Sequence, residues 1–513
     1  MIDFFVKHAL STILTLSLLG ALFVALMPNV EKGCRNVSLL FSGLILLVSL
    51  FMIFYRFDPT LTSLQYVENY KWFGDTIRFK LGTDGLSASM ILLMAILLPV
   101  TIIASEPIAQ EKPKFYYSML MLLTTSVMGV FMAQDLFLFF LFWELELVPM
   151  YFLIAVWGGP NKDYASIKFL IYTFVAGACL FAGVLIIFFA SGAGTFDMEV
   201  LFGQAKNLSH NFQMLCFLLL FICFIVKLPS FPFHTWLPDA HVEAPTPVSM
   251  LLAGILLKMG GYGIYRLCVG LFPNILIELA LFIAILGAVN IVGAAIACLV
   301  QDDMKRIIAY SSVSHMGFVL LGIASLTSAG FSGGIFQMFS HGLISAALFM
   351  LVGTLYERTH TRKISDYGGV AKYMPKCFYF FLLAAMANLA LPALSGFVGE
   401  SLVFYGAFSS KFFALFPTKF YFNFGQICVL FSAMGVVLTA AYMLWLIQRV
   451  FMSDPNTKWS NLTDLRGSEI FVLGSLLVLV IVFGVYPSWL SNLYEPSSTH
   501  LVEYVSNLIK AIV

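Results

Sequence analysis

Residues 226–247 read Val-Lys-Leu-Pro-Ser-Phe-Pro-Phe-His-Thr-Trp-Leu-Pro-Asp-Ala-His-Val-Glu-Ala-Pro-Thr-Pro, so five prolines follow Lys227 in an otherwise apolar region. Each proline removes a backbone N–H donor, and a helix cannot run regularly through such a segment. Inside a membrane, irregular backbone is tolerated only where protein buries it or where it lines a watery cavity. The segment therefore predicts a broken membrane helix.

A second segment of the same kind is Leu391-Pro-Ala-Leu-Ser-Gly-Phe-Val-Gly-Glu400. An ionisable residue precedes each break at a similar distance: Glu144 lies 83 positions before Lys227, and His315 lies 85 positions before Glu400. Broken helices at corresponding positions of two halves are typical of transporters built from internal repeats. The spacing therefore favours a two-fold internal repeat.

The composition indicates a polytopic membrane protein. Of the 513 residues, 60% are hydrophobic and 11% are charged, and the mean hydropathy is +0.93. A soluble domain usually carries about 25% charged residues. The net charge of +1 and the lack of a basic run argue against nucleic acid as a partner, which leaves membrane lipid and other proteins.

Apolar runs long enough to cross about 30 Å of hydrocarbon predict about 14 transmembrane helices in an all-α fold. They lie near residues 5–27, 36–55, 86–106, 115–133, 135–157, 165–190, 211–228, 246–271, 275–299, 306–325, 330–356, 375–408, 424–450 and 468–488. Alternate loops hold about fifteen Lys and Arg on one side and about ten on the other, which predicts that both termini lie outside the cytoplasm.

No cofactor site is visible in the sequence. The eight cysteines show no C-x-x-C spacing, and no glycine-rich phosphate-binding motif is present. The chain is therefore expected to hold no iron–sulfur cluster, structural zinc or nucleotide. His234, Asp239, His241 and Glu243 are metal-ligand types, but prolines intervene and the spacing matches no zinc site, so metal binding is not expected.

Six ionisable residues are predicted at mid-membrane depth, where a charge costs about 2.5–3.5 kcal/mol on insertion scales. In chain order they are Glu144, Lys227, Lys258, His315, His341 and Glu400. The structural alternatives are salt bridges for the acids, interfacial positions for the lysines and hydrogen-bonded packing for the histidines. The succession of acid, lysines, histidines and acid favours a proton path, because a channel would show rings of like charge and a solute carrier a polar pocket.

Two further charged residues, Glu146 and Lys168, each fit more than one role. Glu146 lies two positions after Glu144, which is about 200° around a helix, so the two carboxyl groups face different directions and need separate partners. A salt bridge that locks two helices is more strongly favoured for Glu146 than for Glu144. Lys168 lies near a predicted helix start, where an interfacial position and a pairing with Glu144 fit equally well.

Several motifs together are specific to one family. They are Phe142-Trp-Glu144 with Pro149-Met-Tyr-Phe152 and Trp157-Gly-Gly159; Lys227-Leu-Pro229 with His234-Thr-Trp-Leu-Pro-Asp-Ala-His241; Leu252-Ala-Gly-Ile-Leu-Leu-Lys258; Asp303-Met-Lys-Arg306 with Ala309-Tyr-Ser-Ser-Val-Ser-His-Met-Gly317; and Ser395-Gly-Phe-Val-Gly-Glu400. Along nearly its full length the chain resembles the antiporter-like subunits of respiratory complex I. It is most similar to subunit M, the bacterial counterpart of mitochondrial NADH dehydrogenase subunit 4.

The resemblance implies a 14-helix subunit with two inverted five-helix repeats, helices 4–8 and 9–13, in which helices 7 and 12 are broken. The implied domains are residues 1–110 for helices 1–3, 111–272 for the first repeat, 273–452 for the second repeat, and 453–513 for helix 14 and the tail. It also implies that Glu144 pairs with Lys227, that Lys258 links inward, that the two histidines bridge the halves, and that Glu400 leads to the periplasmic side.

The implied activity is proton translocation as a subunit of NADH:quinone oxidoreductase. NADH oxidation and quinone reduction, with FMN and iron–sulfur clusters, would occur in partner subunits, and this chain would hold no cofactor. The implied partners are other complex I membrane subunits, including neighbouring antiporter-like subunits. The implied location is the bacterial inner membrane, with both termini on the periplasmic side.

Two related assemblies remain alternatives. The motif Trp143-Glu-Leu-Glu-Leu147 also resembles the corresponding subunit of the plastoquinone-linked complex of cyanobacteria and chloroplasts. In that complex ferredoxin would replace NADH as the electron donor. Multi-subunit cation/proton antiporters share the Glu and Lys motifs and have no redox partner. A short amphipathic tail from Ser491 to Val513 disfavours subunit L, whose family adds a long lateral helix. A purely structural scaffold is disfavoured because it would leave the buried charges without purpose.

Overall fold

The computed structural model describes residues 8–416 and 422–512. In these ranges, 13 helices are long and apolar enough to cross a membrane. They are α2 (Ala9–Leu26), α3 with η1 (Glu31–Arg56), α4 (Gly85–Ala104), α5 (Pro113–Met132), α6 with α7 (Leu136–Trp157), α8 (Lys162–Ser191), α10 (His210–Lys227), α12 to η4 (Thr246–Val269), α14 (Pro273–Leu299), α15 (Met304–Ala324), α16 (Ser328–Thr359), α20 with η7 (Phe424–Met452) and α21 (Gly467–Val485).

A further apolar helix is divided into α17 (Pro375–Asn388) and α18 (Ser395–Phe408), each of 14 residues. Each half is shorter than the roughly 20 residues that a straight transmembrane helix needs. Together with the long helices these halves account for the predicted number of spans. The all-α, multi-span fold predicted from the composition is confirmed.

Both predicted helix breaks are present. α10 ends at Lys227, where Leu228 donates its N–H to the Phe224 carbonyl at 2.7 Å, and α11 begins only at Trp236 and ends at Glu243. α17 and α18 are separated by a segment in which Ala390 and Ala393 have φ angles of 55° and 72°. Proline explains both interruptions, because it cannot donate the backbone bond that continues a helix.

One feature that the apolar-run analysis did not predict is an antiparallel hairpin of β1 (Gln65–Phe73) and β2 (Ile77–Thr83). It is fastened to the ends of neighbouring helices: Gln134 donates its backbone N–H to the Lys80 carbonyl, and the Lys80 ammonium lies 2.8 Å from both Asp197 carboxylate oxygens. Other short elements are η2 (Ala205–Asn207), α9 (Met198–Gln204), α19 (Lys411–Ala414), η5 (Ile364–Asp366), η6 (Val370–Lys372) and η8 (Thr457–Trp459). The last described helix, α22 (Ser488–Ile512), is 25 residues long.

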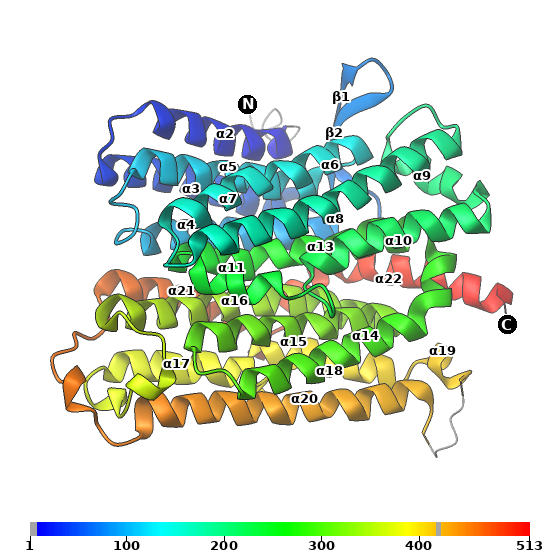
Figure 1. The fold of residues 1–513 in the computed structure, drawn as a ribbon. Coiled ribbons are helices and arrows are strands. Elements are labelled where there is room, and N and C mark those ends of the chain that lie inside the picture. The colour runs from blue at the N-terminus through cyan, green and yellow to red at the C-terminus, as the bar shows by residue number, and fades with distance from the viewer. Residues whose placement is uncertain (1–7, 417–421, 513) are drawn as a thin grey trace. The chain divides into compact units, whose positions relative to one another are not determined.

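The chain forms two compact units. Unit 1 comprises Met1–Leu228, Ile255–Leu279 and Asn492–Val513, and unit 2 comprises Pro229–Gly254 and Ala280–Ser491. Within unit 1, α8 and α10 lie side by side (Figure 1) and pack against each other. Within unit 2, α16 packs against α15, α18 and α21. The repeat boundaries implied by the family resemblance rest on a different criterion and stay a prediction.

Candidate functional site

Lys227 is the last residue of α10 and is almost fully enclosed within unit 1. Its side chain is 2% exposed, and its ammonium forms an ion pair with the Glu146 carboxylate, which is 0% exposed. The ammonium also lies 5.8 Å from the centre of the Trp143 ring and 5.6 Å from that of Phe169. Aromatic faces attract a cation but offer no proton acceptor, so the carboxylate is the group that balances the lysine charge.

This pairing differs from the one that the family resemblance implied. The expected partner of Lys227 was Glu144, whereas the acid in contact with the ammonium is Glu146. The two acids lie where α6, which ends at Leu145, meets α7, which starts at Leu147, and Glu146 itself keeps helical dihedral angles of φ −63° and ψ −28°. Pro149 has no N–H to donate to the Leu145 carbonyl, which interrupts the helix at this point. Glu146 therefore lies at a junction from which it reaches α10.

Glu144 points to another helix, as the angle of about 200° between the two acids predicts. Its Oε1 atom lies against Gly177 of α8, so closely that a Cβ added at Gly177 would be 1.7 Å from it. That oxygen is buried and has no hydrogen-bond partner in the described part of the chain. Lys168, whose pairing with Glu144 had stayed open, has its ammonium 5.5 Å from the Tyr164 ring.

Lys258 is the third predicted site residue in unit 1. It is 0% exposed and lies on α13 (Leu257–Gly263), between the π-helical turns η3 (Leu252–Leu256) and η4 (Ile264–Val269). Such turns are rare and often occur at functional sites. Gly260 lets α13 approach the end of α10, since a Cβ there would lie 2.5 Å from the Leu228 nitrogen. The helix of Lys258 is thus packed directly onto the helix that carries Lys227.

Unit 2 contains a second buried cluster. The Nδ1 atom of His315, on α15, lies 3.0 Å from Oε1 of Glu400, on α18. The imidazole rings of His315 and His341 have centres 5.4 Å apart. A carboxyl group and two imidazoles arranged in this way can hold and pass a proton, because an imidazole nitrogen can gain or lose one. The structure therefore brings together three residues that lie far apart in the sequence.

Gln337 belongs to this cluster and was not predicted. Its Nε2 atom lies 3.4 Å from both the His315 Nδ1 and the Glu400 Oε1 atoms. A signal existed in the sequence: Gln337 precedes His341 by one helical turn, and residues four apart share a helix face. A polar side chain on the histidine face of an apolar helix needs a buried partner.

The residues considered as metal ligands take other contacts. Asp239 forms an ion pair with Arg306 at 2.7 Å, and the His241 ring stacks on Phe349 with a centre-to-centre distance of 4.4 Å. In residues 8–416 and 422–512, no three His, Cys, Asp or Glu side chains are grouped as a metal site would require. Asp239 and His241 thus take part in charge pairing and ring stacking within unit 2.

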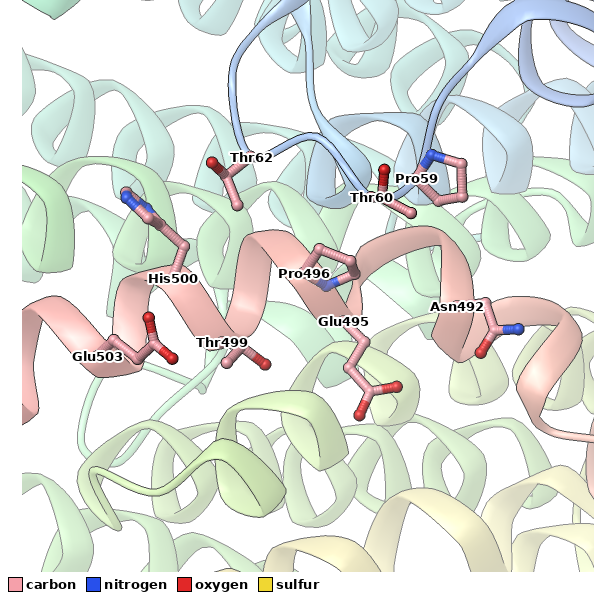
Figure 2. A pocket seen from close by; sticks show the side chains of 9 residues that line it. All are labelled: Pro59, Thr60, Thr62, Asn492, Glu495, Pro496, Thr499, His500 and Glu503. Carbon is pink, nitrogen blue, oxygen red and sulfur yellow. The ribbon is translucent and has the colours of Figure 1, made fainter.

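A cavity of about 530 Å³ lies in unit 1 outside the charged clusters. Figure 2 shows α22 beside the segment of residues 59–62, with Pro496 and His500 on the side of the helix nearer to Thr60 and Thr62 and Glu495 pointing the other way. Its lining is Pro59, Thr60, Thr62, Asn492, Glu495, Pro496, Thr499, His500 and Glu503. None of the six predicted site residues lines it, so the candidate site consists of the two buried clusters and Lys258.

Comparison with known proteins identifies the family. The model for the transmembrane family described as NADH:quinone oxidoreductase/Mrp antiporter matches residues 133–423. The NAD(P)H-quinone oxidoreductase chain 4 of Gloeobacter violaceus is 43% identical over 496 residues, which cover 96% of this chain and 92% of that relative. The chain belongs to the chain 4 family. The resemblance to complex I antiporter-like subunits is thereby confirmed.

Solved structures share the fold of this chain 4 family member. Respiratory complex I from Thermus thermophilus contains a chain that is 26% identical, with a TM-score of 0.85 and coverage of 98% of this chain and 99% of that chain. A chain of the Mrp complex from Dietzia sp. has a TM-score of 0.83 with the same coverage but only 19% identity. The second likeness shows a common fold and carries no functional assignment.

Proposed function

We propose that the chain is a proton-translocating membrane subunit of an NAD(P)H-quinone oxidoreductase of the complex I type. The observation that carries the proposal is the enclosed Lys227–Glu146 pair in a chain of the chain 4 family. Replacing a buried ion pair by apolar residues is often neutral or stabilising. Ionisable groups at membrane depth are therefore expected to serve function rather than stability.

The proposed proton path uses groups from both units. In unit 1 the groups are Glu144, Lys227 and Lys258, and in unit 2 they are His315, His341 and Glu400. Each can gain or lose one proton at a nitrogen or oxygen atom. A redox-driven change in the environment of the Lys227 ion pair would release its proton toward Lys258, and Glu400 would serve the exit side. The two inverted repeats and their boundaries at residues 110, 272 and 452 are part of this proposal.

The electron chemistry is proposed to occur in partner subunits. NADH oxidation and quinone reduction need FMN, iron–sulfur clusters and a quinone, and the sequence of this chain offers no motif for them. The structural similarity to a chain of Thermus thermophilus complex I supports an assembly with other membrane subunits. The inner membrane, with both chain termini on the periplasmic side, is the proposed location.

Purification of the intact assembly tests this function. The chain would be tagged in its native host, extracted in a mild detergent, and its co-purifying subunits counted by mass spectrometry. Stoichiometric NADH-oxidising subunits with flavin and iron–sulfur clusters would support the proposal. Ferredoxin-binding subunits in their place would indicate that ferredoxin is the electron donor, as in the related complex of cyanobacteria and chloroplasts. Only antiporter-type membrane subunits would overturn the proposal in favour of cation/proton exchange.

A further inference from the structure

Two carboxyl groups near the end of α10 differ in their surroundings. Glu146 is fully enclosed and its Oε2 atom holds the Lys227 ammonium. Glu144 is partly exposed, its Oε1 atom lies against Gly177, and the charges of Lys227 and Glu146 both act on its carboxyl group. Within the described residues both acids leave Oε1 buried without a hydrogen-bond donor, but the Lys227 ammonium contacts the other oxygen of Glu146. The same short stretch of helix therefore presents one acid that contacts the ammonium and a second, on another side of the helix, that lies within reach of its charge.

We propose that Glu146 is the permanent counter-charge of Lys227 and that Glu144 is a separate acid that reloads this lysine with protons. The proposal deepens the proposed function and rests on it. A buried ammonium without a counter-charge is costly, and Glu146 supplies that charge from a fully enclosed position. A buried oxygen that no donor compensates is suited to a neutral carboxylic acid, which is the form of Glu144 that can give a proton away.

The reloading step is a simple proton transfer. After Lys227 has released one proton toward Lys258, its neutral amine takes a proton from the Glu144 carboxylic acid. One O–H bond breaks at Glu144, one N–H bond forms at Lys227, and the Glu144 carboxylate regains a proton from water. Glu146 stays ionised throughout, so the ammonium forms beside a negative charge that is already in place.

Variants in the intact membrane complex test the two roles. Glu146→Gln removes the counter-charge and keeps the side-chain volume, so Lys227 should hold its proton poorly. Proton pumping per electron should fall about tenfold at about pH 8 and recover toward about pH 6, where abundant protons refill the lysine. Glu144→Gln should reduce pumping at every pH, because an amide cannot deliver a proton. Complex content and the uncoupled quinone reductase rate provide the controls for assembly.

The outcomes separate the two proposals. Wild-type pumping by Glu146→Gln at every pH, with an inactive Lys227→Ala variant, would overturn the counter-charge role and leave the proposed function standing. A loss in Glu146→Gln that does not vary with pH would also overturn the division of roles. Pumping retained by Lys227→Ala would instead overturn the proposed function itself.

A matched pair of glycine variants tests Glu144 without touching either acid. A Cβ at Gly177 would lie 1.7 Å from the Glu144 Oε1 atom, whereas a Cβ at Gly183 of the same helix would meet its nearest atom, of Leu220, at 3.3 Å. Gly177→Ala should therefore displace the Glu144 carboxyl group and lower pumping at every pH. Gly183→Ala should pump normally. Equal pumping by the two assembled variants would contradict the loading role of Glu144.

Discussion

The two units use different bases to hold a buried carboxyl group. In unit 1 the ammonium of Lys227 pairs with Glu146, and in unit 2 the imidazole of His315 lies 3.0 Å from Glu400. Both pairs are buried, and each joins a base and an acid on different helices. The comparison indicates the same arrangement built from different chemistry: an ammonium that can only donate hydrogen bonds in unit 1, and an imidazole that can donate at one nitrogen and accept at the other in unit 2.

The units also differ in which member of the pair, the base or the acid, lies next to the helix break. In unit 1 the base ends α10 immediately before the break, whereas in unit 2 the acid lies in α18, after the break, and the base lies in the continuous helix α15. Each break thus carries one member of a pair whose other member belongs to a separate helix. A shift of either half-helix would change the distance within a pair, which is the kind of change that can release a proton.

Loss of Lys227 should have the largest effect. Lys227→Ala leaves the fully enclosed Glu146 without a cation, and breaking a buried pair on one side costs about 3–5 kcal/mol. We expect less assembled complex, a lower thermal inactivation temperature and no proton pumping, measured in native membranes. Lys114→Ala removes an exposed lysine at the start of α5 and serves as the control, which should match the wild type.

The double variant Lys227→Ala with Glu146→Ala separates stability from function. Removing both charges takes away the unpaired carboxylate, so complex content and thermal stability should recover relative to Lys227→Ala. Pumping should stay absent, because the protonated amine is gone. Recovery of pumping together with stability would mean that the pair in unit 1 is structural.

Glu400→Gln should have a smaller effect. A hydrogen bond to a charged group contributes about 1.5–3 kcal/mol, and a carboxylate that accepts the Nδ1–H of His315 forms such a bond whether the imidazole is neutral or protonated. The variant keeps the side-chain volume and leaves an amide that can still hydrogen-bond to His315, so its thermal stability should fall by less than that of Lys227→Ala. The uncoupled quinone reductase rate of membranes after heating measures this loss.

Glu469→Gln is the matched control for that measurement. Glu469 is also buried in unit 2, where its oxygens lie 3.0 and 2.7 Å from the Arg358 guanidinium. Because arginine is always charged, Glu469→Gln leaves a buried cation without its counter-charge and should lose more thermal stability than Glu400→Gln. An equal or greater loss in Glu400→Gln would contradict the weaker pairing expected between His315 and Glu400.

Sequence patterns predicted where the two helices break, but they did not predict which acid pairs with Lys227. Proline acts on the backbone locally, so the ends of α10 and α17 could be located from composition alone. The partner of Lys227 depends on where α6 gives way to α7, and a shift of one or two residues on a helix redirects a side chain by 100° or more, about 200° for two. The angle between Glu144 and Glu146 was predictable, whereas the choice of acid was not.

The hairpin β1–β2 is a second feature that apolar runs do not predict. The predicted spans end at residue 55 and resume at 86, and the residues between them contain both strands. Without a long apolar run such a stretch is predicted to be a loop, whereas a strand is recognised by the alternation of apolar and polar residues. The pairing of Lys80 with Asp197 is a contact over a long sequence distance, which no local pattern specifies.

Gln337→Leu should have the smallest effect. Its Nε2 atom lies 3.4 Å from both His315 Nδ1 and Glu400 Oε1, longer than the 3.0 Å contact between those two. Long hydrogen bonds are weak, so the stability lost should be about 1 kcal/mol or less. Heat inactivation of membranes that carry this variant, measured beside Glu400→Gln, would decide it, and an equal loss in the two variants would mean that the amide holds His315 as firmly as the carboxylate does.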